Sequence, residues 1–285
     1  MITIKNLKFR YKRTVPLFED LSLDIPQGSI IGLLGRNGEG KSTLMKLITG
    51  QLLPSAGTLS FGDFDVTKRH YQYLQQVFML PEDMVVPRVT VRAYFDMIAP
   101  FYPNYDERIA QEIAQAFEID WSWSLHKISL GQRKKCLIAL AISLRTPILL
   151  LDEPTNGLDI PSKSVFRRLL LKYGSDEQTI IISTHQVRDL EQLLDYIIML
   201  DGNKIVCNGS IAALSETLAF GEVTEANAER AIYREFMVLG EYGVWKHADL
   251  EPALQGEFSM ELFFNAMIAQ RARMNEVLNH QIEIK

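Results

Sequence analysis

The segment from Gly35 to Ser42 has the composition and the spacing of a phosphate-binding loop. It fits the pattern G-x-x-x-x-G-K-[S/T] at every fixed position, with Gly40 and Lys41 completing the set. Glycine lets the backbone approach an anion closely, the Lys41 ammonium neutralises negative charge, and the Ser42 hydroxyl can ligate Mg²⁺. The other residues that we assign to this cradle are Asn37, Gly38, Glu39 and Thr43. The segment therefore predicts a site for a nucleotide phosphate.

The segments on either side of the cradle predict the elements that it needs. The apolar run at residues 30–34 indicates a buried strand, whereas Leu44, Leu47 and Ile48 recur at helical spacing. Gly50 can end this helix. A cradle between a strand and a helix faces its anion with backbone amides and with the positive end of the helix dipole, so the context supports a nucleotide site.

A second predicted strand ends in two carboxylates. Residues 148–151 are aliphatic, and Asp152 and Glu153 follow them directly. Because the carboxyl ends of parallel strands meet at one edge of a sheet, we expect both carboxylates to lie beside the cradle. There Asp152 can support Mg²⁺, and Glu153 can orient and activate a water for attack on a terminal phosphoryl group. His185, after a strand at 179–182, can hydrogen-bond the same phosphate; a purely structural carboxylate or histidine is the alternative at each position.

Composition and charge limit the class of protein. The 285 residues include 30 basic and 35 acidic side chains, a net charge of −5, and we see no basic block, which argues against nucleic acid as the main partner. The longest apolar runs are shorter than the roughly twenty residues needed to cross a bilayer. We interpret Arg133, Lys134 and Lys135 as a solvated helix face or a dimer contact. Cys136 and Cys207 lie in apolar surroundings and predict reduced core thiols, and we find no ligand set for zinc or an iron–sulfur cluster.

The remaining patterns predict an α/β fold with a core of the P-loop NTPase type and a mainly parallel sheet. An antiparallel β subdomain precedes the core, and a helical insertion interrupts it at about residues 83–144. We expect a further helix around residues 187–194, a domain boundary that separates residues 1–214 from 215–285, and a mainly helical C-terminal extension. A stripe in that extension is interpreted as core packing rather than a ligand site: Met260, Phe264, Met267 and Met274.

Six elements, in this order along the chain, resemble those of the nucleotide-binding subunits of ATP-binding cassette (ABC) transporters. They are an aromatic residue before the cradle (Tyr11), the Walker A segment (35–42), a signature-like sequence (Ile128–Gln132), the Walker B segment (148–153), a D-loop (Asn156–Asp159) and a switch histidine (His185). The match covers about residues 2–214. The resemblance implies that the chain binds ATP and Mg²⁺ and that Tyr11 stacks on the adenine.

The resemblance also implies a shared site. Two cassettes, either two copies of the chain or one copy and a paralogue, would pair head to tail with ATP between them. Ser129, Gly131 and Gln132 of one chain would then face the cradle of the other, and Asp159 of the D-loop would contribute to the same nucleotide site. Ser129 can also be the N-cap of a helix that begins near Gly131, and the two roles are compatible.

Three residues depart from the pattern or add charge to it. Glu82 stands where the family usually has glutamine, in the loop between core and insertion; it can ligate Mg²⁺ or position a water in catalysis, or it is a solvated loop residue. Leu130 replaces the first glycine of the signature, which we expect to be tolerated because its backbone amide remains available. Glu39 adds an acidic side chain to the cradle, and we expect it to point to solvent or toward a partner chain.

These features predict an ATP-hydrolysing subunit that dimerises on ATP and powers a separate integral membrane permease, in an exporter rather than an importer. Such a subunit would be cytoplasmic, held at the inner face of the cell membrane by the permease. One alternative is a soluble cassette ATPase that remodels a partner outside transport, and another is a low-turnover module that senses ATP. The sequence predicts neither a nucleic-acid partner nor a metal cluster, and it does not identify the transported substrate.

Overall fold

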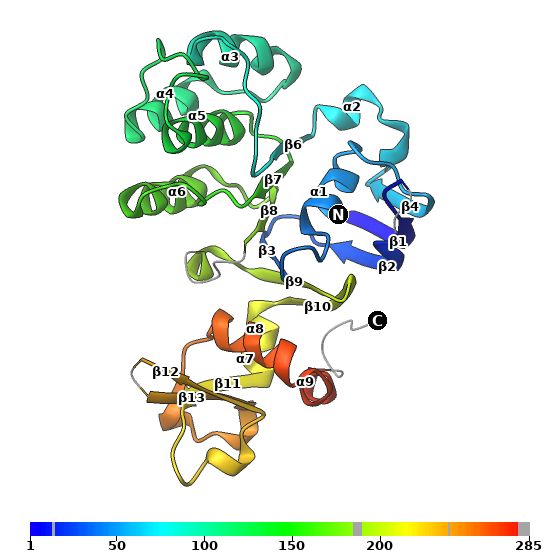
Figure 1. Ribbon diagram of the computed structural model, residues 1–285, viewed down its shortest axis with the longest axis vertical. Helices are drawn as coiled ribbons and strands as arrows, with labels where there is room; N and C mark the ends of the chain where they lie inside the picture. The colour runs from blue at the N-terminus through cyan, green and yellow to red at the C-terminus, as the bar shows by residue number, and fades with distance from the viewer. Residues whose placement is uncertain (13–14, 185–189, 239, 279–285) are drawn as a thin grey trace.

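The computed structural model describes residues 1–12, 15–184, 190–238 and 240–278. Within these residues a six-stranded sheet lies at the centre, in the spatial order β10-β9-β3-β8-β7-β6 (Figure 1). All neighbouring pairs are parallel except β9 and β10, so the prediction of a mainly parallel sheet is confirmed. The strands are β3 (Ile30–Leu34), β6 (Val77–Leu80), β7 (Ile148–Asp152), β8 (Thr179–Ser183), β9 (Tyr196–Asp201) and β10 (Lys204–Ser210).

Both faces of this sheet are covered. Helix α1 (Lys41–Ile48) packs against one face, and α5 (Leu130–Ser143) and α6 (Ile160–Tyr173) pack against the other (Figure 1). Every residue of β7 and β8 is therefore buried, which explains why their sequences are aliphatic runs without polar alternation.

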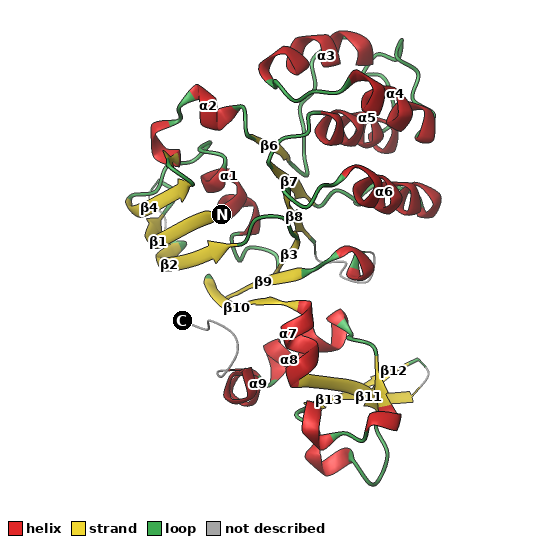
Figure 2. Ribbon diagram, turned by 180° about the vertical axis from the view of Figure 1, so that it is seen from behind, coloured by secondary structure: helices red, strands yellow, loops and turns green. Residues whose placement is uncertain are grey.

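A second, antiparallel sheet lies beyond α1, as predicted for the first part of the chain. Its order is β2-β1-β4-β5, and its inward side chains share one apolar cluster with α1 and the central sheet. The short helix α2 follows it (Figure 2). The bounds are β1 (Ile2–Phe9), β2 (Phe18–Ile25), β4 (Ala56–Phe61), β5 (Phe64–Asp65) and α2 (Tyr71–Leu74).

The insertion is helical, as predicted. It contains α3 (Val91–Ile98), α4 (Glu107–Ala116) and α5, and the Thr90 side chain caps α3 by accepting a hydrogen bond from the Ala93 amide. Trp121 packs edge-on against Phe95 with ring centroids 4.9 Å apart. The insertion thus has its own apolar interior, continuous with the face of the sheet that α5 covers.

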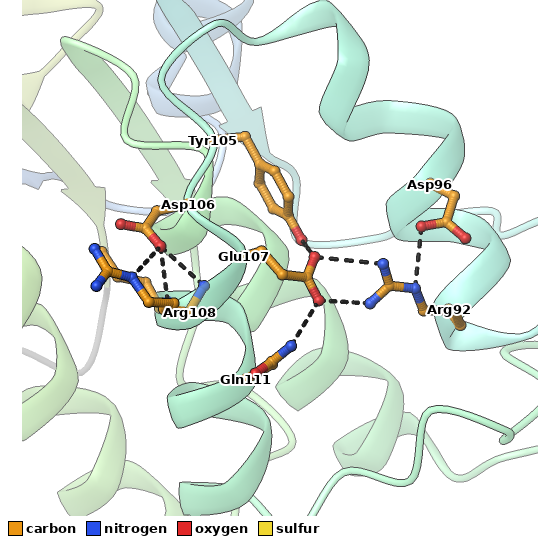
Figure 3. A network of polar contacts seen from close by, with 8 residues as sticks. Arg92, Asp96, Tyr105, Asp106, Glu107, Arg108 and Gln111 are labelled. Atoms are coloured by element: carbon orange, nitrogen blue, oxygen red, sulfur yellow. Dashed lines mark hydrogen bonds and ion pairs between the residues drawn. The ribbon is translucent and has the colours of Figure 1, made fainter.

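A polar network orients α3 against the start of α4 (Figure 3). Arg92 contacts Asp96 one turn later at 3.1 Å and Glu107 at 2.6 Å. The same Glu107 carboxylate accepts hydrogen bonds from the Tyr105 hydroxyl at 2.7 Å and from Gln111 Nε2 at 3.1 Å. Exposed ion pairs contribute little stability individually, so the network mainly fixes the relative direction of the two helices.

The helix predicted around residues 187–194 differs from what is observed. Residues 185–189 lie outside the described part of the chain, and the remainder forms only a 3₁₀ turn at Glu191–Leu193. Leu194 already has extended backbone because the chain enters β9 at Tyr196. The apolar side chains of Leu190, Leu193 and Leu194 are buried.

The C-terminal extension contains the expected helices and also a sheet that was not predicted from the sequence. Within the described residues, four antiparallel strands lie in the order β12-β13-β11-β14. Figures 1 and 2 label three of them, β11, β12 and β13. Glycines and glutamates interrupt the alternation of apolar and polar residues in these strands, which explains the omission. The elements are α7 (Ile211–Thr217), β11 (Leu218–Glu222), β12 (Tyr233–Met237), β13 (Gly240–Lys246), β14 (Gln255–Gly256), α8 (Met260–Ala269) and α9 (Arg271–Leu278).

The methionine stripe of the extension is core packing, as predicted. Met260, Met267 and Met274 are fully buried, and Phe264 packs beside them. Their cluster extends to side chains of β9 and β10 in the central sheet, so the extension is docked on that end of the core. The predicted boundary at residue 214 falls inside α7, and the domain limits stay a prediction.

None of the helices in the described ranges combines the length and the apolar character needed to cross a membrane.

Truncating the buried stripe should loosen the extension. We expect Met274→Ala to lower the free energy of unfolding of this region by about 2–5 kcal/mol, because it leaves a cavity in a closed cluster. The matched control is Met97→Ala, whose side chain is 52% exposed and should cost less than about 0.5 kcal/mol. Urea unfolding followed by circular dichroism measures both; equal losses for the two variants would contradict the packing role.

Candidate nucleotide-binding site

The cradle connects the end of β3 to the first residue of α1, and two of its glycines, Gly35 and Gly40, are required by space as well as by conformation. Gly40 has φ 99°, and a Cβ atom there would lie 2.7 Å from the ring of Phe18. Gly35 has φ 153°, and a Cβ atom there would lie 2.7 Å from the carbonyl oxygen of Leu200. A larger residue at Gly35 or Gly40 would displace the loop, so the backbone can keep this conformation only with glycine at these two positions.

Lys41 folds back across the loop. Its ammonium donates to the carbonyl oxygens of Gly35 at 2.7 Å and Arg36 at 3.1 Å, and the side chain is buried. Burial lowers the pKa of Lys41, while the nearby carboxylates of Glu153 and Asp152 oppose that shift. The ammonium is therefore already positioned inside the cradle, close to both carboxylates.

The neighbouring strand fixes the Asp152 carboxylate and the backbone of Glu153 at the end of β7. Asp152 lies in register with Ser183 of β8, whose hydroxyl donates to the Asp152 carboxylate. The same hydroxyl accepts a hydrogen bond from the Glu153 amide at 3.1 Å, and Glu153 has φ 46°, in the left-handed region. Both carboxylates are only 4% exposed. Sequence reasoning missed Ser183, although a serine ending an isoleucine run beside Asp152 was the available signal.

One pocket of about 360 Å³ gathers most of the predicted site residues. Tyr11 lies at the pocket, where its hydroxyl is 2.9 Å from the hydroxyl of Thr43. The Ser42 hydroxyl and the carboxylates of Asp152 and Glu82 supply the oxygen donors that suit Mg²⁺. The lining residues are Tyr11, Leu17, Asn37, Gly38, Gly40, Lys41, Ser42, Thr43, Glu82, Asp152 and Glu153.

Glu82 is held from two sides. Its side chain is exposed, yet its Oε1 accepts a hydrogen bond from Asn156 Nδ2 at 2.9 Å, and its backbone oxygen accepts one from Lys134 Nζ at 3.1 Å. The interpretation of Lys134 as part of a solvated face is wrong, since this side chain is only 4% exposed. Burial lowers the pKa of Lys134, and the carboxylates of Glu82 and Asp152 oppose the shift.

The signature-like residues lie away from this pocket, at the start of α5. Ser129 is the N-cap: its hydroxyl accepts from the Gln132 amide at 3.2 Å, and Gln132 Oε1 accepts from the Ser129 amide at 3.0 Å. A Cβ atom at Gly131 would lie 2.8 Å from the Gly157 oxygen, so glycine is needed for contact with the D-loop. The Leu130 side chain is 63% exposed.

Two further predicted residues make contacts within the chain. Asp159 caps α6 by accepting from the Ser162 amide at 2.8 Å, and this hydrogen bond lowers the pKa of Asp159. Glu39 accepts from the Asn203 amide at 2.8 Å, so the expectation that it points to solvent or to a partner is wrong. Asn203 belongs to the turn between β9 and β10, which lies close enough to bind the Glu39 carboxylate. His185 lies outside the described residues.

The two cysteines are core thiols, as predicted. Cys136 and Cys207 are both buried and unbridged, and burial raises the pKa of each thiol to about 12.

Comparison with known proteins identifies the family. Residues 18–156 match the family model described as "ABC transporter". The ABC transporter ATP-binding protein NatA of Bacillus subtilis (strain 168) is 30% identical over 227 residues, which cover 76% of this chain and 92% of NatA. The chain belongs to the ABC transporter ATP-binding proteins.

Two other relatives agree with this family. The ABC transporter ATP-binding protein YtrB of the same organism is 30% identical over 191 residues, or 66% of this chain and 65% of YtrB. A solved structure described as the ATP-binding subunit of an ABC transporter superposes with a TM-score of 0.69, at 24% identity, over 75% of this chain and 92% of the other. It supports the fold of this ABC ATP-binding protein.

Removing the cradle ammonium should abolish tight nucleotide binding. We expect Lys41→Ala to weaken the Kd for Mg·ATP about 100-fold, because charge-assisted contacts to phosphate are strong in a buried site. Lys46→Ala, in the last turn of the same helix, makes the same charge change and should alter the Kd less than about threefold. Isothermal titration calorimetry gives both values, and similar weakening in the two variants would show that only net charge matters.

Proposed function

We propose that this chain hydrolyses ATP and thereby powers transport through a separate integral membrane permease. The observation that carries the proposal is the pocket in which the cradle lysine faces two buried carboxylates at the end of a parallel strand. NatA and YtrB, to which the chain is similar, are ATP-binding proteins of ABC transporters, and this similarity supports the link to transport.

We assign the following roles within the pocket. Tyr11 would stack on the adenine, and the cradle amides with Lys41 would hold the phosphates. Ser42, Asp152 and Glu82 would hold Mg²⁺. The ion, when bound, would neutralise negative charge on the phosphates. Glu153 would orient the attacking water and draw off its proton, since it is buried beside Lys41 and fixed by its own amide contact.

We further propose that the site is completed by a second cassette, either another copy or a paralogue. Ser129, Gly131, Gln132 and Asp159 do not line the pocket of their own chain, and they gather where α5 meets the D-loop. Two strongly exposed apolar side chains flank this surface, Leu130 at 63% and Ile160 at 84%. Burial of these side chains against a partner would favour association, and the helix start of α5 would then face the partner's ATP.

The place of action follows from the proposed permease, which would hold the cassette at the cytoplasmic face of the membrane. Export is the direction that we propose, and ATP-dependent efflux from reconstituted vesicles would test it. The low-turnover ATP sensor is the second candidate, favoured by the carboxylate of Glu82 and by Leu130 in the signature.

Substitution of the proposed general base separates hydrolysis from binding. We expect Glu153→Gln to lower the steady-state rate of ATP hydrolysis by about 10²–10⁴, because an amide cannot accept the proton of the water. The Kd for Mg·ATP should change by less than about threefold. Glu251→Gln, on the exposed surface of the extension, is the control and should keep full turnover. A wild-type protein that binds ATP without turnover, even with its permease, would favour the sensor.

Purification from membranes tests the transport role. We expect an affinity-tagged chain, extracted with mild detergent, to bring down one integral membrane protein in stoichiometric amount. The same protein should be absent when the tag is on Lys41→Ala, if ATP binding strengthens the complex. Recovery of only soluble partners would support the remodelling ATPase instead.

A further inference from the structure

Lys134 is a buried cation for which the proposed mechanism has no use. It lies on α5, one turn beyond Gly131, and donates from Nζ to the backbone oxygen of Glu82 at 3.1 Å. The acidic groups whose charge acts on it are Glu82, Asp152, Asp83 and Glu153. The catalytic edge is therefore flanked by two buried ammonium groups, Lys41 from the cradle and Lys134 from the signature helix.

The burial of this lysine carries an energetic cost. Lys134 is the fifth residue of α5 and only 4% exposed. Burying an ammonium group is unfavourable unless acidic groups and hydrogen-bond acceptors compensate for it. An apolar residue would fit the buried face of α5 without this cost, whereas the ammonium makes a hydrogen bond to Glu82 and is attracted by the neighbouring carboxylates.

Glu82 needs such a contact because it lies in a loop. Residues 81–89 form no helix or strand, and the Glu82 side chain is exposed. Only two contacts fix it among the described residues: Lys134 on its backbone oxygen and Asn156 on its carboxylate. Asn156 is itself tied to the catalytic edge, since its amide donates to the backbone oxygen of Glu153 at 3.2 Å.

We propose that Lys134 is a positioning residue of the ATPase site, which acts through Glu82 by holding its backbone and by offsetting its added negative charge. The inference rests on the proposed function, because it assigns a role in ATP hydrolysis. It also connects two parts of the molecule: the helix that would present Ser129 and Gly131 to a partner's ATP is the helix that fixes Glu82 beside the chain's own site.

The test is a double-mutant cycle between Lys134 and Glu82. Lys134→Met keeps the length and removes the charge, and we expect it to lower kcat about tenfold or more while the Kd for Mg·ATP changes less than about threefold. Glu82→Ala should lower kcat to a similar extent. In the Glu82→Ala background, adding Lys134→Met should cost less than about a further threefold, because the carboxylate that Lys134 positions is gone even though its backbone acceptor remains.

Two further variants separate positioning from packing. Lys134→Arg keeps the cation and should retain at least about a third of kcat. Lys127 is exposed and directly precedes the signature-like sequence. Lys127→Met removes the same charge without breaking a buried contact and should leave kcat unchanged. Should Lys134→Met not fold, judged by circular dichroism, Lys134→Gln takes its place with the same expectation.

The outcomes are distinguishable. Equal losses from Lys134→Met with and without Glu82→Ala would overturn the inference and leave Lys134 a purely structural residue, as would a Lys134→Met enzyme with unchanged kcat. Either result would leave the proposed function intact as long as the wild type hydrolyses ATP. A wild type that neither binds nor hydrolyses Mg·ATP would overturn both.

Discussion

The parallel pairing of β7, β8 and β3 is the constraint on which the site depends. These strands are neighbours and end at the same edge of the sheet, so the cradle, the two carboxylates and Ser183 lie close together there. The hydrogen-bond ladder sets Asp152 opposite Ser183, and a slip of one residue would turn Asp152 to the other face of the sheet. Backbone register, rather than any side-chain contact, thus decides that a serine hydroxyl is available to hold Asp152 and the Glu153 amide.

Two buried lysines balance the negative charge of the carboxylates at this edge of the sheet, and both do so in the same way. Lys41 and Lys134 are both buried, and each satisfies its ammonium with backbone carbonyl oxygens of a nearby loop while remaining close to the carboxylates. A carbonyl acceptor satisfies the hydrogen bond without cancelling the charge, so each lysine still opposes the repulsion between Asp152 and Glu153. Each lysine also fixes the loop whose carbonyl it binds.

The parts of the fold and site that sequence predicted are those encoded in short segments. The cradle, the aliphatic strand before Asp152 and the N-cap at Ser129 each depend on a few consecutive residues, and the structure contains them. What could not be predicted depends on segments that meet only in three dimensions. The contact from Glu39 to Asn203 spans 164 residues, and the burial of Lys134 depends on a loop 52 residues earlier. The sheet of the extension was missed for a different reason, because its glycines and charges weaken the alternation that marks a strand.

The turn between β9 and β10 joins the extension to the cradle. Asn203 donates to Glu39 within the cradle, and Asp201, two residues earlier, pairs with Arg271 of α9 at 3.1 Å. The backbone of Leu200 is also the surface that excludes a side chain at Gly35. Docking of the extension and closure of the cradle therefore share one element. In thermodynamic terms their free energies are linked: whatever stabilises this turn from the side of α9 also stabilises the loop that is proposed to bind phosphate, and the reverse holds to the same extent.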